Sequence, residues 1–256
     1  YINDFGLDEQ SVILDPFCGT GTTLVEAKLN QINAIGLEAN IFPYFASTVK
    51  TDWNIDPDEL KAFAEEVAEK AYAQLASQGI DDRSLNVKQG VKLRTLSDQA
   101  SRALIKNSIS PLPLHKTLIL LDQINLFQHT PAHKYGILAL GNALVKSIGN
   151  LRFGPEVGVG KIKNDVMVVA AWMQEISKII SDLGLLYGKD FPEACVFLAD
   201  ARRVDQIIEK NSIDAVITSP PYPNEKDYTR TTRLESVVLG FIKDMSQLRN
   251  YKKTLI

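Results

Sequence analysis

Two glycines within a short polar stretch are the residues whose spacing most directly suggests chemistry. The stretch DPFCGTGT, residues 15–22, follows an apolar run rich in strand formers at 11–14 and precedes a helical pattern of apolar residues at 23–29. Gly19 and Gly21 allow the backbone to turn tightly and to approach a ligand closely. The amino end of the following helix presents N–H groups to a polar or negatively charged ligand. The stretch therefore predicts a ligand-binding turn between a strand and a helix.

This turn differs from the dinucleotide fingerprint G-x-G-x-x-G, because Leu24 stands at the third glycine position. Instead, DPFCGTGT resembles motif I of the S-adenosylmethionine-dependent amino-methyltransferases of DNA, and residues 17–21 match their F-x-G-x-G core. The resemblance implies S-adenosylmethionine as the cofactor. It assigns cofactor binding in this turn to Asp15, Phe17, Gly19, Gly21 and Thr22. We also expect Thr22 or Thr23 to cap the helix.

A second motif, Thr218-Ser219-Pro220-Pro221-Tyr222, follows another short strand pattern at 214–217. Two prolines fix two backbone φ angles, and the aromatic ring offers a flat surface on which a base can stack. The resembling family carries [DNS]-P-P-[YFW] at the end of its fourth strand, where this motif holds the target base. The resemblance therefore assigns catalysis to Ser219, Pro220, Pro221 and Tyr222.

Two carboxylates end strand-like runs and are predicted to contact the cofactor. Glu38 ends the run 34–38, about twenty residues beyond the glycine turn, where nucleotide sites place an acid against ribose hydroxyls. The resembling family has its ribose-binding acid at the same point. Asp200 ends the run 194–200, and the resemblance implies that it bonds the adenine amino group. An alternative role for Asp200 is to cap a helix at 203–209.

The segment that follows Tyr222 is polar and aromatic and is suited to contact nucleic acid. Arg230 and Arg233 are predicted to bind phosphate, Tyr228 to stack on a base, and Asn224 to make a further contact. The glycine-rich stretch 152–161 fails the phosphate-loop pattern, because proline stands at a required glycine and no hydroxyl follows the lysine. We expect that stretch to be a flexible loop.

The composition is that of an ordinary globular protein, with 45% hydrophobic and 23% charged residues in a chain of 256. The net charge of −3 counts mildly against nucleic acid as a partner. No apolar run reaches the length of a membrane span, and two cysteines do not suggest a disulfide framework, so we expect a cytoplasmic protein. No metal site is predicted, because Pro131 interrupts the pair His129 and His133.

The resemblance covers residues 11–50 and 190–240 and implies an α/β fold, a doubly wound and mostly parallel Rossmann-like methyltransferase sheet. We expect residues 1–55 and 190–256 to form the S-adenosylmethionine-binding catalytic domain. Residues 56–189 are expected to form a mainly helical insertion between strands two and three that recognises the substrate. The resembling sheet has more strands than the four visible here, so we expect the chain to be truncated at one or both ends.

Helical periodicity dominates the insertion. Pro57 with two acids in the first turn predicts a helix that Gly79 ends. Further helices are expected at 96–105, 118–127, 135–148, 166–183 and, beyond the insertion, 234–248. The prolines at 111, 113 and 131 are expected to break the helical pattern.

The resemblance implies methyl transfer to an exocyclic amino group of a DNA base, as in restriction–modification systems with a partner endonuclease. Serine at the head of the second motif favours cytosine N4 over adenine N6. Cys18 lies in the cofactor turn and is not expected to be an attacking thiol. Alternatives are a tRNA guanine amino-methyltransferase, which has a similar turn, and a non-catalytic cofactor-fold remnant. The enzyme hypothesis requires Gly19 and Ser219 to lie at neighbouring strand ends. The sequence does not indicate the oligomeric state.

Overall fold

The chain divides into two compact units in the computed structural model, which describes residues 2, 4–154, 156–220 and 227–254. Unit 1 contains residues 1–53, 188–229 and 249–256, and unit 2 contains residues 54–187 and 230–248. Our sequence-based boundaries place 230–248 with the catalytic domain, whereas here these residues belong to unit 2.

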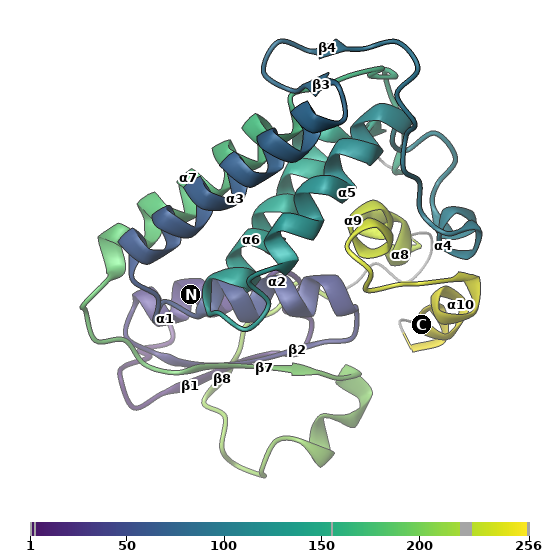
Figure 1. Cartoon of the computed structure of the whole chain (residues 1–256). Coiled ribbons are helices and arrows are strands. Elements are labelled where there is room, and N and C mark those ends of the chain that lie inside the picture. Colours follow the sequence, from purple (N-terminus) through teal and green to yellow (C-terminus); the bar gives the residue numbers. More distant parts are fainter. Residues whose placement is uncertain (1, 3, 155, 221–226, 255–256) are drawn as a thin grey trace. The chain divides into compact units, whose positions relative to one another are not determined.

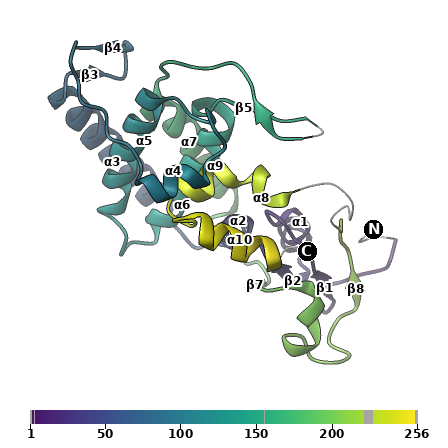
Figure 2. The ribbon, with the colours of Figure 1, turned by 90° about the vertical axis from the view of Figure 1, so that its right-hand side faces the viewer.

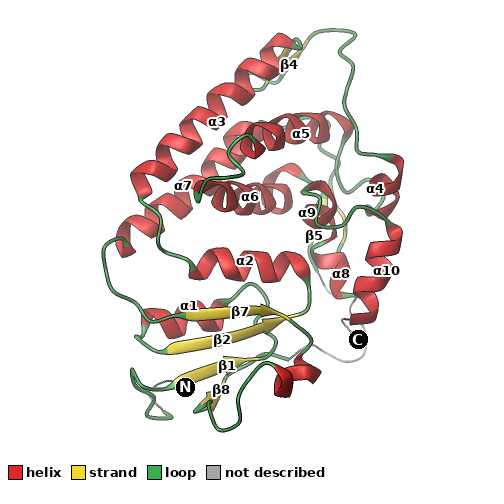
Figure 3. Cartoon of the chain, turned by 60° about the horizontal axis from the view of Figure 1, so that its bottom comes forward, coloured by secondary structure: helices red, strands yellow, loops and turns green. Residues whose placement is uncertain are grey.

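Unit 1 is built on a parallel sheet of four strands in the order β7-β2-β1-β8 (Figure 3). The strands are β1 (Val12–Asp15), β2 (Asn33–Glu38), β7 (Ala194–Leu198) and β8 (Ala215–Val216). Each coincides with one of the four strands that the apolar runs predict. When the four strands are numbered by their order along the chain, their spatial order across the sheet is 3-2-1-4, as in doubly wound nucleotide-binding folds. The predicted α/β fold class is confirmed.

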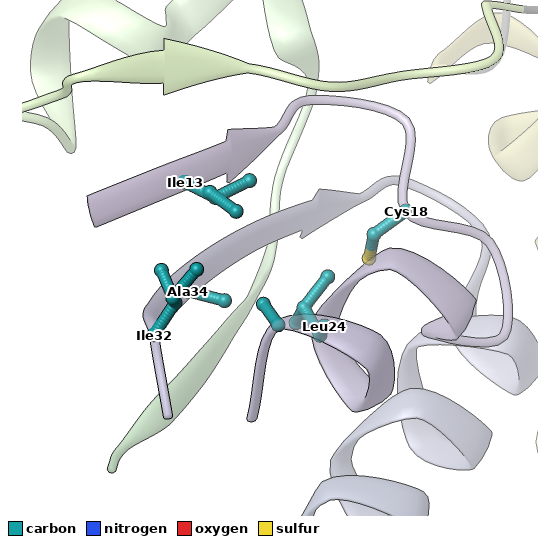
Figure 4. Close-up of a cluster of buried hydrophobic side chains, with 6 residues drawn as sticks. Ile13, Cys18, Leu24, Ile32 and Ala34 are labelled. Carbon is teal, nitrogen blue, oxygen red and sulfur yellow. The ribbon is translucent and has the colours of Figure 1, made fainter. Parts of the chain in front are cut away.

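Two helices, α1 (Thr22–Leu29) and α2 (Ile41–Thr51), lie on one face of this sheet (Figure 1). The core between α1 and the strands consists of Ile13, Cys18, Leu24, Ala27, Ile32 and Ala34. Figure 4 shows the Cys18 side chain, in the turn after β1, within this cluster. The turn that was predicted to bind the ligand is therefore anchored in the core by its own side chain. A 3₁₀ helix, η2 (Ala201–Gln206), follows β7.

Unit 2 is mainly helical, as predicted for the insertion. Its elements are α3 (Pro57–Ser77), β3 (Ile80–Asp81), β4 (Asn86–Val87), α4 (Asp98–Ala103), α5 (Pro111–Asn125), α6 (Ala132–Ala143), the π-helix η1 (Leu144–Ile148), β5 (Leu151–Arg152), β6 (Gly158–Val159), α7 (Val168–Leu186) and α9 (Arg233–Val238). Two further helices, α8 (Tyr228–Thr231) and α10 (Met245–Thr254), include residues of both units. Among the described helices, none is both long and apolar enough to cross a membrane.

Three local predictions are wrong for identifiable reasons. Helix α5 begins at Pro111, because prolines fit the first turn of a helix, where N–H groups have no intrahelical partner. The helix expected at 234–248 is interrupted after Val238, where Gly240 adopts a φ of +83°. The stretch expected to be a loop at 152–161 contains β6 and one residue of its antiparallel partner β5.

A glycine allows three helices of unit 2 to meet closely. A Cβ added at Gly136 of α6 would lie 2.9 Å from the ring of Phe63 on α3, so only glycine admits this ring. The Gly136 carbonyl accepts a hydrogen bond of 2.9 Å from the indole N–H of Trp172 on α7. Phe63 and Trp172 themselves pack edge to face at 6.4 Å. This junction fixes α3, α6 and α7 relative to one another.

A buried ion cluster joins three segments of unit 2. The ammonium of Lys116 on α5 lies 3.0 Å from the Asp82 carboxylate and 2.5 Å from that of Asp165. The side chains of Lys116 and Asp82 are fully buried. Asp82 also accepts hydrogen bonds from the N–H groups of Val168 and Val169, the first residues of α7. One carboxylate therefore caps α7 and pairs with a lysine of α5.

The buried carboxyl of Glu235 on α9 gives unit 2 a pH dependence. Burial raises the pKa of Glu235 to about 8 from its ordinary value of 4.5. Among the described residues its Oε2 atom has no hydrogen-bond partner. The folded chain keeps this proton over a pH range in which the unfolded chain has lost it. Stability that is present below pH 4.5 is therefore lost as the pH rises to about 8.

We expect Glu235→Gln, which carries no titrating proton, to remove this loss. In urea unfolding, the wild type should lose on the order of 2–3 kcal/mol relative to the variant between pH 5.5 and pH 8.5. Glu66→Gln, at an exposed position on α3, is the control and should follow the wild-type curve. Parallel pH curves for the wild type and Glu235→Gln would contradict the prediction.

Candidate functional site

The two sequence motifs lie at the ends of neighbouring parallel strands. Strand β1 leads into the glycine turn, β8 leads into the Ser-Pro-Pro-Tyr motif, and the two strands pair in parallel. One residue beyond β8, the Ile217 N–H donates to the carbonyl of Leu14 in β1 at 3.0 Å. The predicted juxtaposition of the strand ends that precede Gly19 and Ser219 is confirmed.

Asp15 ties the two loops together through its side chain. It is 3% exposed, and its Oδ1 atom accepts a hydrogen bond of 2.7 Å from the Thr218 hydroxyl. The same oxygen accepts one of 3.1 Å from the Phe17 N–H, which begins the glycine turn. Ser219 follows Thr218 directly. One carboxylate thus fixes the start of the first loop against the start of the second.

The glycine turn has a packed side and an open side. The Gly21 N–H donates to the Cys18 carbonyl at 2.8 Å, and both Gly19 and Gly21 have positive φ, +54° and +85°. A Cβ at Gly21 would lie 2.9 Å from the Cβ of Ser47 on α2, whereas a Cβ at Gly19 would meet no described atom within 4 Å. Gly21 therefore serves packing, and Gly19 leaves space in which a ligand could lie against the backbone.

The predicted cap of α1 is wrong. Helix α1 begins at Thr22 with Gly21 as its N-cap, and no side chain caps it. The turn requires a left-handed residue at this position, and only glycine adopts that conformation without strain. Because glycine has no side chain, it does not cap the N–H groups in the first turn of α1. A helix end that binds an anion needs N–H groups that no side chain has capped.

Glu38 links the end of β2 to the glycine turn. Its Oε2 accepts a hydrogen bond of 2.9 Å from the Gly19 N–H, and its Oε1 accepts one of 2.6 Å from the Asn40 N–H. Burial raises the pKa of Glu38, and these backbone donors oppose that rise. The carboxylate is therefore held in one position beside Gly19. Its contact with ribose stays a prediction.

Cys18 is not in a state suited to nucleophilic attack. Burial, with Glu38 and Asp15 nearby, raises the pKa of its thiol to about 12. Since the thiolate is the nucleophilic form, a thiol that stays protonated at neutral pH is unreactive. Its side chain also fills a gap beside Gly36, where an added Cβ would lie 2.8 Å from the sulfur.

Asp200 lies at the end of β7, next to the end of β2. The Ala199 N–H donates to the Glu38 carbonyl at 3.0 Å, which continues the pairing of these strands. The Asp200 carboxylate accepts a hydrogen bond of 2.9 Å from the Arg202 N–H, and its Oδ2 lies 2.5 Å from the Arg202 guanidinium. It thus caps the 3₁₀ helix η2, close to the alternative role we considered. Its contact with adenine stays a prediction.

The Ser-Pro-Pro-Tyr motif is described only in part. Ser219 and Pro220 are exposed, whereas Pro221, Tyr222 and Asn224 lie outside the described residues. Their roles stay predictions.

Three residues predicted to contact nucleic acid lie in short helices that follow this motif. Tyr228 begins α8, Arg233 begins α9, and both are half-buried. Arg230 is also half-buried, and its Nη2 donates a hydrogen bond of 3.0 Å to the Val157 carbonyl within unit 2. Part of its guanidinium therefore serves the fold. The phosphate and base contacts of these residues stay predictions.

Sequence reasoning missed three residues next to the turn. Thr218 was quoted only as the start of a motif, and its bond to Asp15 joins positions 203 apart in sequence. Ser47 packs against Gly21, and the Lys50 ammonium lies 3.4 Å from the Thr20 hydroxyl. Burial lowers the pKa of Lys50. No local pattern distinguishes Ser47 or Lys50 from other polar residues on a helix.

Together these residues form a row along the carboxyl edge of the sheet. In spatial order the row runs from Asp200 after β7, through Glu38 at the end of β2 and Gly19 after β1, to Ser219 after β8. The chain reverses its winding direction at β1, and in such sheets ligands bind outside the carboxyl ends at this point. No cluster of three or more potential metal ligands occurs among the described residues. The row suits an organic ligand that spans several strand ends.

Comparisons with known proteins bear on what this row binds. A protein-family model described as DNA methylase, of the N6- and N4-methylating type, matches residues 5–47, which contain β1, the glycine turn, α1 and β2. The Type II methyltransferase M.BsoBI of Geobacillus stearothermophilus is 29% identical over 254 residues, which is 93% of this chain and 49% of that protein. The resemblance to DNA amino-methyltransferases is confirmed.

Two further relatives match a shorter part. The Type II methyltransferases M.AvaI of Nostoc sp. (strain PCC 7120 / SAG 25.82 / UTEX 2576) and of Anabaena variabilis are each 39% identical over 72 residues, 28% of this chain and 15% of theirs. The chain thus spans about half the length of the Type II methyltransferase M.BsoBI, and the M.AvaI matches cover less of those proteins. No solved structure matches it significantly.

Proposed function

We propose that this chain carries the cofactor site and the base-holding loop of an S-adenosylmethionine-dependent DNA amino-methyltransferase, with cytosine N4 as the favoured target. The observation that carries the proposal is the hydrogen bond between Asp15 and Thr218, because it fixes the two motif loops side by side. A methyl donor in one loop and an acceptor amine in the other are then close enough to react.

The glycine turn is the proposed cofactor site. The open side of Gly19 fits a bound ligand, and Glu38 lies beside it at the end of β2, where its free lone pairs can accept ribose hydroxyls. When bound, S-adenosylmethionine supplies a methyl group on a positively charged sulfur. The residues Asp15, Phe17, Thr22 and Asp200 are proposed to line the remainder of this site.

Two glycine variants separate cofactor binding from folding. Gly21→Ala should lower the free energy of unfolding by about 2–3 kcal/mol, because it adds left-handed strain and a clash with Ser47. Gly19→Ala should cost only about 1 kcal/mol of strain and weaken S-adenosylmethionine binding by about tenfold, because its methyl group enters the open space. Urea unfolding and calorimetry measure the two effects. Equal cofactor affinity in Gly19→Ala and wild type would place the cofactor elsewhere.

The Ser-Pro-Pro-Tyr loop is proposed to hold the target base. The lone pair of an exocyclic amine is delocalised into the ring, so the amine is a weak nucleophile. The Ser219 hydroxyl and the Pro220 carbonyl accept hydrogen bonds from the N–H groups of this amine. These hydrogen bonds draw the nitrogen towards tetrahedral geometry as positive charge develops on it. Stacking on Tyr222 holds the base, which leaves a duplex before it reacts. No covalent attachment is needed, in agreement with the protonated thiol of Cys18.

The deciding experiment is transfer of a labelled methyl group from S-adenosylmethionine to unmethylated DNA and, in parallel, to tRNA, followed by nucleoside analysis. We expect label in DNA as N4-methylcytosine. Tyr222→Ala, prepared in the same way, controls for contaminating methyltransferases and should lose the label. Label in N6-methyladenine would correct the target base, and label in tRNA would favour an RNA enzyme. Binding of the cofactor without methyl transfer to DNA or tRNA would favour a non-catalytic role. A restriction–modification system with a partner endonuclease is proposed only if DNA is labelled.

A further inference from the structure

The β5–β6 hairpin extends from the helices of unit 2 (Figure 2). Leu151 pairs with Val159, and Arg152 pairs with Gly158. A Cβ added at Gly158 would meet no described atom within 4 Å, so this part of the hairpin has space around it. The proposed catalytic chemistry makes no use of this hairpin.

Cations and large apolar side chains alternate on the hairpin and its exit. Phe153 is 51% exposed and Ile162 is 47% exposed. Arg152 and Lys161 are exposed as well, and neither forms an ion pair with another described residue. Glu156 is the acid of this segment and is exposed. Phe153 directly follows Arg152 at one end of the hairpin, and Ile162 directly follows Lys161 at its exit, so each exposed apolar side chain is next in sequence to a cation.

The base of the hairpin is fixed to the body of unit 2. The Asn150 side chain donates to the Asn107 carbonyl at 3.0 Å and accepts from the Lys163 N–H at 2.9 Å. The Lys163 ammonium donates to the carbonyls of Ser147 and Gly149, each at 2.7 Å, so its charge is used inside the fold. These contacts hold the two ends of the hairpin segment in place.

Arg230 braces the returning strand. Its Nη2 donates to the carbonyl of Val157, which is 6% exposed and precedes β6. This hydrogen bond and the contacts of Asn150 and Lys163 tie both ends of the hairpin to unit 2.

We infer that this hairpin is a DNA-contacting element, in which Arg152 and Lys161 neutralise phosphates and Phe153 contacts a base or sugar. The inference rests on the proposed function, which makes DNA the substrate. A polyanion with flat bases is complementary to both features of the surface, the unpaired cations and the exposed ring. Arg230, which its sequence context predicts to bind phosphate, positions the hairpin in this proposal.

The salt dependence of binding tests the phosphate contacts. Binding of a fluorescent 40-base-pair duplex of mixed sequence is measured between 50 and 300 mM KCl for wild type, Arg152→Ala/Lys161→Ala and the charge-matched control Lys61→Ala/Lys70→Ala. Removal of two phosphate contacts should reduce the slope of log affinity against log salt by about 1.8. The control should keep the wild-type slope, because its lysines lie on the exposed face of α3.

A second variant tests the aromatic contact. Phe153→Ala should weaken duplex binding by about tenfold without changing the salt slope, because a neutral ring that wedges against the base steps of a duplex releases no counterions. Leu126→Ala removes a side chain that is 65% exposed in unit 2 and serves as the control. Thermal unfolding of every variant establishes that it is folded.

The outcomes separate this inference from the proposed function. The inference is overturned if Arg152→Ala/Lys161→Ala keeps the wild-type salt slope and Phe153→Ala keeps the wild-type affinity for DNA. If the wild type still transfers methyl groups to DNA, the proposed function stands. A wild type that binds the duplex but transfers no methyl group to DNA refutes the proposed function. In that case the salt slopes still decide whether the hairpin contacts DNA.

Discussion

Asp15→Ala is expected to weaken S-adenosylmethionine binding about 100-fold and to reduce methyl transfer in proportion. The substitution leaves the Phe17 N–H and the Thr218 hydroxyl without their shared acceptor, so neither loop keeps its position. Loss of two hydrogen bonds to a charged group costs about 3 kcal/mol, which corresponds to roughly 100-fold in affinity. Isothermal titration calorimetry with the cofactor measures the change directly.

The same strand pair offers a matched control. Asp214 accepts a hydrogen bond of 2.8 Å from the Val12 N–H, at the opposite end of β1 from the loops. Asp214→Ala should lower stability modestly and leave cofactor affinity within about twofold, because a hydrogen bond contributes about 1 kcal/mol and this one lies away from the site. A double-mutant cycle of Asp15→Ala and Thr218→Val should give a coupling energy of about 1 kcal/mol or more. Additive effects would mean that the Asp15–Thr218 bond does not organise the site.

Lys116→Ala is expected to destabilise the protein by about 3–5 kcal/mol, because it leaves the buried Asp82 carboxylate without a counter-charge. Asp165 loses the same partner. The substitution removes the attraction between Lys116 and the two carboxylates. It also removes the favourable interaction that offsets the cost of burying the Asp82 carboxylate, so the effect exceeds that of a surface ion pair. Urea unfolding monitored by far-ultraviolet circular dichroism measures it, and the transition of unit 2 is the one expected to move.

Lys146→Ala provides the comparison within the same unit. Lys146 pairs with Glu175 at 2.7 Å, but its own side chain is 56% exposed. Because this lysine is exposed and Lys178 still pairs with the buried Glu175 carboxylate at 2.6 Å, the substitution should cost only about 0–1 kcal/mol. If Lys116→Ala and Lys146→Ala unfold at the same urea concentration, the buried cluster does not stabilise the fold in the way its geometry indicates.

The sheet could be predicted from sequence because each of its strands is a short apolar run followed by polar residues. The starts and ends of helices were harder, since they depend on backbone conformation. Pro111 begins a helix where a breaker was expected, and Gly21 caps α1 by adopting a conformation that the neighbouring threonine does not. In both cases the residue type is compatible with either role, and its place in the turn decides which role it takes.

The motifs predicted the strand ends that make up the site, but not the contacts between them. The bond from Asp15 to Thr218 crosses 203 positions, and no local pattern contains that information. The same limit applies to the Glu235 carboxyl, whose burial depends on the packing of α9 against other segments of unit 2. Polar residues that are braced or buried by distant partners are the ones that sequence reasoning leaves unassigned.

The protonated thiol in the glycine turn has a practical consequence for spectroscopy. The chain has two cysteines, and Cys195 on β7 is exposed while Cys18 is buried. An electrophilic dye at neutral pH will therefore attach at a single position without engineering, two strands away from the turn. The natural sequence thus already carries a fluorescence reporter position on the same sheet as the proposed cofactor site.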